Sequence, residues 1–311
     1  MSLFDEGLEV ISGRTGLKSF GIVPFFKQAH RLPAEDALAL AHERQASVGA
    51  IKVCVPVLSR IANFDDLDPL LAEPDVAVEF IKPGTVFPGD ADLIVLPGTK
   101  AVLADLDFLR HQGWHIDIEA HRRRGGLLLG LCGGYQMLGG LLDDPDGLEG
   151  EPGRRPGLGM LDVETVLKGD KKLFEVSGRE VLSGEAVRGF EMHMGRTSGK
   201  GLKNPMLELE GRNEGAVSQD GRVMGCYLHG LFASDPFRQA FLARIREREP
   251  SGLAYDAEIE SVLDALATPD QVRHILGGLF AYWLTGFSKG KRCEILFSRS
   301  KRSTVWRSAW R

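Results

Sequence analysis

The sequence predicts a three-layer αβα fold with a mostly parallel β-sheet. Short, nearly continuous apolar segments that suit buried strands alternate with longer segments that suit helices. Strands have this composition when helices cover both faces of a parallel sheet. With 311 residues, 43% of them apolar, the chain is long enough and apolar enough to bury such a core.

The elements of this fold can be placed in chain order. Apolar runs predict strands at 51–57, 77–81, 92–96 and 126–131. Helices are expected at 101–124, 133–141 and 236–249. Shorter strands are expected within 158–167, 187–192 and 222–228. Ahead of all these, we expect a short helix from Gly7, a strand at 19–24 and a helix at 33–45.

Three regions are expected along the chain. Residues 48–249 should form the main domain, because the alternating elements fall there. Residues 1–47 hold only one strand and two helices, which is too little for a core, so we interpret them as the end of a larger domain. Residues 250–311 should form a helical segment and a tail. Within this tail, 286–311 contain eight Lys or Arg and one Glu, which we interpret as an extraneous tail rather than a membrane-surface helix.

Composition argues against several protein classes. The net charge of −5 offers no case for nucleic-acid binding. The four cysteines lie far apart without a Cys-x-x-Cys pair, which argues against a zinc site and a disulfide framework. The N-terminus lacks a signal-peptide pattern, and the longest uncharged run, 125–142, is interrupted by seven glycines, unlike a membrane span. We therefore expect a cytoplasmic protein with no bound metal and no membrane partner.

The strongest local motif is Gly130-Leu131-Cys132-Gly133-Gly134, which joins a predicted buried strand to a predicted helix. It has the form of a nucleophile elbow with cysteine in place of serine. Glycines permit the sharp turn, and the start of a helix favours the reactive thiolate. The N–H groups of Gly133 and of Gly98, in the turn after the preceding strand, could donate to an oxyanion. A structural cysteine that only packs the helix against the sheet is the alternative.

A thiol nucleophile needs a base, and histidine is the usual one. His229 is the first candidate because it ends an apolar strand, where α/β sheets place their sites. His193 is the second, and Glu191 shares its face of a strand, although a structural pair is an equal alternative. His111 and His115 have a spacing that can bind metal, but an exposed helical face is favoured because no carboxylate motif is near.

No phosphate-binding loop is recognised in the sequence. Residues 195–201, GRTSGKG, resemble a P-loop at first, but the first glycine is misplaced. Gly201 also stands where Ser or Thr would bind magnesium. No G-x-G-x-x-G follows a strand either. The chain is therefore not expected to bind ATP or a dinucleotide.

Taken together, the motifs resemble the glutamine-hydrolysing part of the cobyric acid synthase family, which belongs to the class I glutamine amidotransferases with a flavodoxin-like fold. The similar segments occur in the same order: LSRIANFDDLDPL at 58–70, LPGTK at 96–100, GGYQMLG at 133–139, LGMLDVET at 158–165, EMHMGRT at 191–197 and YLHGLF at 227–232. The resemblance covers about residues 7–267, and so many ordered motifs make it highly specific.

This resemblance implies a function in cobalamin biosynthesis. The family converts adenosylcobyrinic acid a,c-diamide to adenosylcobyric acid, with glutamine as the ammonia source. ATP and Mg²⁺ are used by an N-terminal synthetase domain. On this reading Cys132 forms a thioester with glutamine and His229 activates it. Gly98 and Gly133 line the oxyanion hole, and Gln136 is an accessory candidate.

Two departures from the family pattern matter. Most triad amidotransferases have Glu two residues after the histidine, where this chain has Leu231, and the corrinoid branch lacks that residue. What orients His229 is therefore left open, with Glu191 as a candidate. The synthetase domain is missing apart from residues 1–47, so this chain alone should hydrolyse glutamine at best. A separate synthetase chain and a fragment of a longer protein are both compatible with this.

Three other functions stay open. Cobyrinic acid a,c-diamide synthase has a similar cysteine domain, but the segments at 60–64 and 191–197 favour cobyric acid synthase. The amidotransferase subunit that acts on cell-wall lipid precursors also works as a separate chain, but it should lack a synthetase remnant at 7–45. An inactive scaffold of the same fold would be indicated by a replaced Cys132 or His229, and both are present.

Overall fold

The computed structural model describes residues 2–17, 26–32, 50–169 and 172–266. The chain divides into two compact units, Met1–Lys27 with Leu263–Arg311, and Gln28–Val262. The first unit contains helix α1 (Ser2–Thr15) and the last residues of helix α7 (Tyr255–Leu266). The strand expected at 19–24, the helix at 33–45, the boundary after residue 47 and the basic tail lie outside the described residues. They, and the boundary at 249–250, stay predictions.

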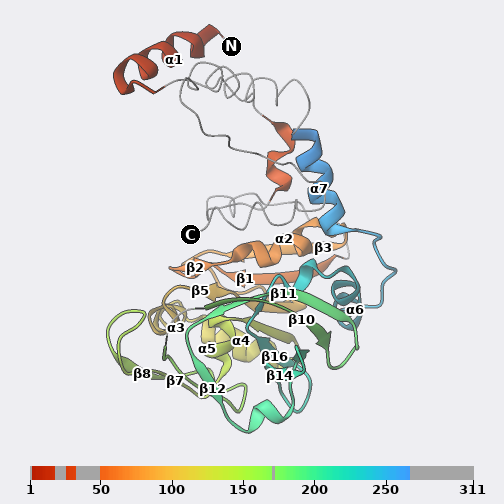
Figure 1. Cartoon of the computed structure of the whole chain (residues 1–311). Helices are drawn as coiled ribbons and strands as arrows, with labels where there is room; N and C mark the ends of the chain where they lie inside the picture. The colour runs from red at the N-terminus through yellow and green to blue at the C-terminus, as the bar shows by residue number, and fades with distance from the viewer. Residues whose placement is uncertain (1, 18–25, 33–49, 170–171, 267–311) are drawn as a thin grey trace. The chain divides into compact units, whose positions relative to one another are not determined.

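A six-stranded sheet forms the centre of the second unit (Figure 1). Its order is β15-β16-β6-β4-β1-β3, and all neighbours are parallel except β15 and β16. The strands are β1 (Ile51–Pro56), β3 (Val76–Ile81), β4 (Leu93–Leu96), β6 (Leu127–Leu131), β15 (Ala216–Val217) and β16 (Val223–Cys226). The predicted, mostly parallel sheet is confirmed, since β1, β3, β4 and β6 match the four strands expected from apolar runs.

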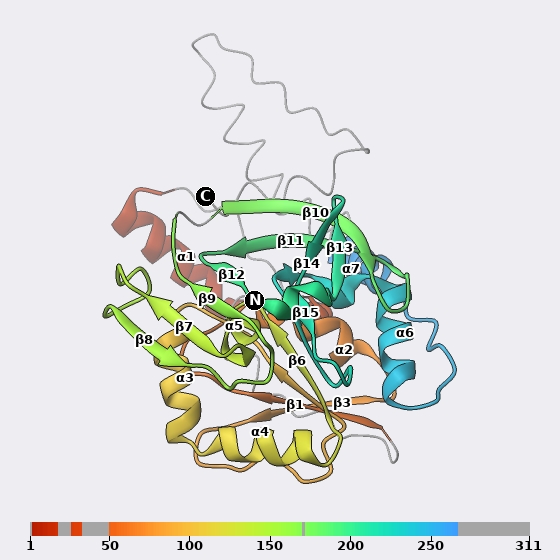
Figure 2. The same ribbon diagram turned by 90° about the horizontal axis from the view of Figure 1, so that it is seen from below.

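Two apolar cores lie on opposite faces of this sheet, because side chains alternate along each strand. On β4, Ile94 and Leu96 join the core of α3 (Val102–His111), α4 (Trp114–Arg123) and α5 (Gly133–Leu138). Leu93 and Val95 join the core with α2 (Asp68–Ala72) and α6 (Asp235–Ile245). Figure 2 shows β1 and β3 between helices α4 and α2. The predicted three-layer arrangement is therefore present.

Three predicted elements differ in detail. The helix expected at 101–124 is two helices, because Gly113 adopts a left-handed φ of 78° between α3 and α4. The helix expected at 133–141 ends at Leu138, and two glycines lead into strand β7 (Leu141–Asp144). The strand expected at 222–228 divides into β16 and β17 (Leu228–His229), which belong to different sheets.

Three smaller sheets complete the unit. One is antiparallel, in the order β14-β13-β10-β11-β17, and contains β10 (Lys172–Glu180), β11 (Ala186–His193), β13 (Leu207–Leu209) and β14 (Arg212–Glu214). A second, β12-β9-β7-β8, contains β8 (Gly153–Pro156), β9 (Glu164–Val166) and β12 (Arg196–Ser198). The third pairs β2 (Ile61–Ala62) with β5 (Gly98–Thr99). Among the described helices, none has both the length and the apolar character that crossing a membrane requires.

Candidate active site

Cys132 occupies a sharp turn between β6 and α5. Its backbone has φ 50° and ψ −108°, a strained conformation for a residue with a side chain. The turn depends on its glycines: a Cβ at Gly134 would lie 2.0 Å from the Leu96 carbonyl oxygen, and one at Gly130 would lie 2.6 Å from the Tyr135 nitrogen. The side chain of Cys132 is partly exposed, in contrast to the buried Cys54 and Cys226. The sharp strand-to-helix turn predicted at Cys132 is therefore present, and its thiol is partly exposed.

Gly98 and Gly133, the proposed oxyanion residues, lie in adjoining turns. A Cβ at Gly133 would approach the side chain of Thr99 to 2.5 Å, so only glycine fits against β5. A Cβ at Gly98 would lie 3.5 Å from the Cε1 atom of His229. The structure thus brings together the two glycine turns and the candidate base at the carboxyl ends of β4 and β6.

His229 is fully buried at the end of β17. Its Nδ1 atom lies 2.7 Å from Oδ2 of Asp66, and the Asn63 amide nitrogen lies 3.0 Å from Nε2. The Phe190 ring stacks on the imidazole with centroids 5.1 Å apart. Cys132 also acts to raise the pKa of His229. The imidazole is therefore held between the Asp66 carboxylate and the Asn63 amide.

The protonated form of His229 is strongly favoured. Burial by itself would lower the pKa of this imidazole, but the charge and hydrogen bond of Asp66, together with Cys132, raise the pKa to about 10. The imidazole of His229 is consequently protonated at neutral pH. This is the condition under which a neighbouring thiol acts as a thiolate.

Two accessory candidates lie beside the elbow, around Tyr227. Gln136, four residues after Cys132, donates from Nε2 to the Tyr227 hydroxyl at 3.2 Å and to the Met194 carbonyl at 3.3 Å. The His193 ring stacks on the Tyr227 ring with centroids 3.7 Å apart. Burial lowers the pKa of His193 to about 4, and the charges of Arg212 and His229 act in the same direction. His193 is therefore neutral at physiological pH.

Glu191 does not orient His229, contrary to the sequence-based suggestion. Its carboxylate forms an ion pair with Arg212, while the Nδ1 atom of His229 is occupied by Asp66. Along β11, Phe190 is the residue that pairs with His229, and Glu191 pairs with Leu228. Because side chains alternate along a strand, Phe190 faces the imidazole and Glu191 does not.

Asp66 and Asn63 are site residues that the sequence did not reveal. Both lie in the segment 58–70, which carries part of the family resemblance, but no role was assigned to either. Asp66 is 163 positions from His229 in the chain. No local pattern distinguishes it from its neighbours Asp65 and Asp68, so only the fold identifies it.

A metal centre is not found in the described residues. Within them, no group of three or more His, Cys, Asp or Glu side chains is placed to hold a metal ion. His111 and His115, at the end of α3 and the start of α4, fall on different helices because Gly113 breaks the predicted helix. Their i,i+4 spacing therefore does not place them on one helical face.

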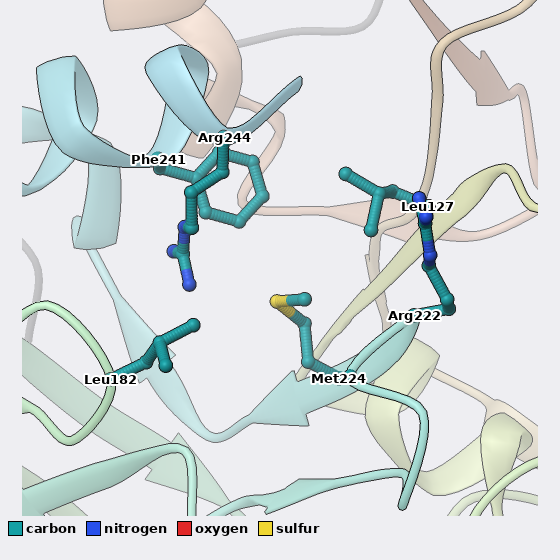
Figure 3. Close-up of a pocket in the computed structure, with 7 residues that line it drawn as sticks. Leu127, Leu182, Arg222, Met224, Phe241 and Arg244 are labelled. Atoms are coloured by element: carbon teal, nitrogen blue, oxygen red, sulfur yellow. The ribbon is translucent and has the colours of Figure 1, made fainter. Parts of the chain in front are cut away.

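A pocket of about 190 Å³ lies away from this chemistry. Figure 3 shows Met224, Phe241 and Arg244 around it, with Leu127 at its edge. Leu127 is the first residue of β6, whereas Cys132 follows the last, so the pocket lies at the opposite end of the strand. Its lining contains neither cysteine nor histidine, and we do not connect it with the site of Cys132.

Comparisons with known proteins agree with this geometry. The model of the CobB/CobQ-like glutamine amidotransferase domain matches residues 52–237. A cobyric acid synthase of Cereibacter sphaeroides is 53% identical over 279 residues, 90% of this chain and 57% of that protein. One from Ruegeria sp. is 54% identical over 86% of this chain and 54% of that protein. The chain thus spans little more than half the length of these curated relatives.

A solved structure, PurLQS from Thermotoga maritima, is 18% identical, with a TM-score of 0.43 over 70% of this chain and 99% of that one. The family match is the stronger finding, because it includes the elbow, the Asp66 segment and His229. The chain therefore belongs to the CobB/CobQ-like glutamine amidotransferase family.

Proposed function

We propose that this chain hydrolyses the side-chain amide of glutamine, with Cys132 as nucleophile and His229 as proton carrier. The observation that carries the proposal is the contact of His229 with Asp66 beside the Cys132 turn, with the pKa of the imidazole raised to about 10 by Asp66 and Cys132. A buried imidazolium beside a cysteine stabilises the thiolate, which is the reactive form of the side chain.

In the first half of the reaction, the Cys132 sulfur attacks the δ-carbonyl carbon of glutamine, and an electron pair moves to the carbonyl oxygen. Backbone N–H groups at Gly98 and Gly133 are the proposed donors to this oxyanion. As the carbon–nitrogen bond breaks, His229 gives its proton to the leaving nitrogen. Ammonia departs and a glutamyl thioester stays on Cys132.

In the second half, water attacks the thioester carbonyl carbon. His229, now neutral, takes a proton from the water as the new carbon–oxygen bond forms. The carbon–sulfur bond then breaks, which releases glutamate and restores the thiolate beside the imidazolium. One glutamine and one water are consumed, and one glutamate and one ammonia are produced.

The ammonia would be used in the ATP-dependent amidation of corrinoid carboxylates. This part of the proposal rests on the relatives, which are cobyric acid synthases of which this chain matches only 57% and 54%. ATP and Mg²⁺ would bind to the portion of those proteins that has no counterpart here, either on the same polypeptide or on a partner chain. The proposed acceptor is adenosylcobyrinic acid a,c-diamide, and the proposed setting is the cytoplasm.

The glutaminase proposal is tested by active-site labelling. A glutamine-analogue diazoketone should add one adduct at Cys132, located by peptide mass spectrometry, and glutamate should form from glutamine. The buried thiols of Cys54 and Cys226 are internal controls that should stay unmodified, and Cys132→Ala should abolish both results. Absence of the adduct, even after the synthetase portion of a cobyric acid synthase is added, would refute the proposal.

The acceptor requires a separate test. With ATP and glutamine, this chain should support amidation of adenosylcobyrinic acid a,c-diamide by the synthetase portion of a cobyric acid synthase. It should not support amidation of cobyrinic acid by the corresponding portion of a cobyrinic acid a,c-diamide synthase. The reverse preference would assign the chain to cobyrinic acid a,c-diamide synthesis and leave the glutaminase chemistry unaffected.

A further inference from the structure

The histidine of the proposed pair needs a group that fixes its orientation, and the residue two positions later cannot supply it. Leu231 is fully buried and apolar. It lies in the short 3₁₀ helix η5 (Leu231–Ala233) and has no atom that accepts a hydrogen bond in its side chain. Any carboxylate that orients His229 must therefore come from another part of the fold.

We infer that Asp66 is the positioning residue of this site, in addition to the proposed Cys132–His229 chemistry on which the inference rests. Its two carboxylate oxygens contact different groups. Oδ2 lies 2.7 Å from Nδ1 of His229, and Oδ1 accepts the backbone N–H of Gly230 at 2.6 Å. Two contacts to consecutive residues fix both the imidazole and the turn that follows it.

This contact determines which ring nitrogen of His229 is available. A carboxylate only accepts hydrogen bonds, so Nδ1 must carry the proton that it donates to Asp66. Nε2 is then the nitrogen left to exchange a proton with Cys132, and the Asn63 amide nitrogen lies 3.0 Å from it. Asp66 is only 5% exposed, and water therefore offers little competition for its oxygens.

The segment that carries Asp66 is itself anchored beside the oxyanion turn. We call residues 59–67 the strap. Its strand β2 pairs with β5 in the register Ile61–Thr99 and Ala62–Gly98. Asp105, fully buried on α3, accepts hydrogen bonds from the Ser59 hydroxyl and the Arg60 backbone N–H of the strap.

Beyond β2, the strap turns at Asn63, which has a left-handed φ of 51°, into the 3₁₀ helix η3 (Phe64–Leu67). The Asp66 backbone N–H then donates to the Asn63 carbonyl at 3.2 Å. One continuous segment consequently sets the position of the Gly98 turn and the orientation of His229. The sequence of the strap does not by itself indicate this positioning role.

The amide variant Asp66→Asn tests this inference sharply. Asparagine has one side-chain oxygen, and the Gly230 N–H requires it. The NH₂ group would then face Nδ1 of His229 and favour the tautomer with its proton on Nε2. That tautomer cannot take a proton from Cys132. A comparable carboxylate-to-amide change in a serine protease lowers kcat by about 10⁴.

We therefore expect Asp66→Asn to lower the rate of diazoketone labelling at Cys132 by about 10²-fold or more. The alkaline limb of the pH–rate profile should move to lower pH, because His229 would lose the charge that keeps its proton. The other titratable groups around His229 are Asp65, His193 and Cys132, so their influence must be controlled.

Asp65→Asn is the matched control. Asp65 is the preceding residue of the same strap, is exposed, and forms no hydrogen bond with His229 in the structure. It should label within about threefold of the unmodified chain, and its alkaline limb should move much less than that of Asp66→Asn, because Asp65 acts on His229 through charge alone. Asp66→Glu keeps the carboxylate and should restore part of the rate. ¹⁵N NMR of His229 gives a further readout, since Nδ1 should lose its proton only in Asp66→Asn.

The outcomes separate this inference from the proposed function. If Asp66→Asn is folded by circular dichroism and labels at the normal rate with an unchanged pH profile, Asp66 has no positioning role, while Cys132 remains the nucleophile. If Asp66→Asn does not fold, the inference is tested instead by the labelling rate of Asp66→Glu and by the protonation of Nδ1 that NMR shows in the unmodified chain. An Nδ1 atom without a proton in the unmodified chain would overturn the inference.

Discussion

The imidazole of His229 has no contact with solvent, yet its charged form is favoured. The reason is local, because a buried charge is tolerated only when it is paired and hydrogen bonded. Asp66 supplies both conditions with one short contact. A buried pair of this kind adds little net stability, but removing one partner leaves the other uncompensated. In this protein the Asp66–His229 pair instead fixes the orientation of His229, the proposed proton carrier, and favours its charged form.

At the scale of this residue, stability should depend on pH in a defined direction. The pKa of His229 is raised from 6.5 to about 10, so its contribution is fully present below about pH 6.5 and is lost as pH rises through 10. Asp66→Asn should therefore lower the free energy of unfolding by about 3 kcal/mol at pH 6 and by less at pH 10. Urea unfolding at the two pH values measures this, and equal losses at both would contradict it.

A second titrating residue, Glu214, lies behind the site. Burial raises the pKa of its carboxyl to about 8, and the Glu191 carboxylate acts in the same direction. The protonated form is thus favoured, and the folded state should lose stability between pH 4.5 and 8. Glu214→Gln should be nearly neutral at pH 5 and stabilise the fold by about 1–3 kcal/mol at pH 9. A destabilisation at pH 9 that exceeds the one at pH 5 would refute this.

At the scale of elements, the elbow depends on close backbone packing between β4 and α5. A methyl group at Gly134 would lie 2.0 Å from the Leu96 carbonyl oxygen. Since neither backbone can move without displacing a strand, Gly134→Ala should cost at least about 3 kcal/mol. Gly140→Ala is the matched control, because its nearest contact would be 3.8 Å and the site is exposed. Equal urea midpoints for the two variants would show that α5 adapts easily.

The strap gives the second prediction at this scale. Asp105 is fully buried and accepts hydrogen bonds from Ser59, Thr99 and the Arg60 N–H. Asp105→Ala leaves these donors without an acceptor, so it should destabilise the fold by about 2–4 kcal/mol and slow labelling of Cys132. Asp107→Ala is the control, because Asp107 is exposed on the same helix and pairs with Arg155. It should change the free energy of unfolding by less than about 1 kcal/mol. Differential scanning calorimetry with labelling kinetics would separate the two effects.

The elements that could be predicted from sequence are those with local signals. β1, β4 and β6 are apolar runs, and the elbow is a contiguous motif between a strand and a helix. β10 was missed because its apolar residues Leu173 and Phe174 are exposed, so the strand lacks a buried pattern. The Asp66–His229 contact was missed for a different reason. It joins residues 163 positions apart, and nothing near Asp66 in the chain records it.

At the scale of the whole molecule, the proposed function gives the chain one half of a two-step chemistry. It spans 57% of the length of a Cereibacter sphaeroides cobyric acid synthase that is 53% identical to it. The residues of the proposed glutamine site, from Asn63 to His229, all lie in the family-matched region. In the proposed function, the ammonia is used by the portion of the relatives that has no counterpart here.

If the two portions act separately, added ammonia should replace glutamine as the nitrogen source. In a complex of this chain with the synthetase portion of a relative, Cys132→Ala should abolish corrinoid amidation that uses glutamine, because no thioester can form. The same complex should still amidate when ammonium chloride is supplied at high pH, where free ammonia is abundant.

Asp66→Asn should show the same pattern to a lesser degree, whereas Asp65→Asn should use both nitrogen sources normally. Mass spectrometry of the corrinoid product measures each rate. If Cys132→Ala abolished the ammonium-dependent reaction as well, the cysteine site would be needed for more than ammonia supply, and the two portions could not be functionally separate.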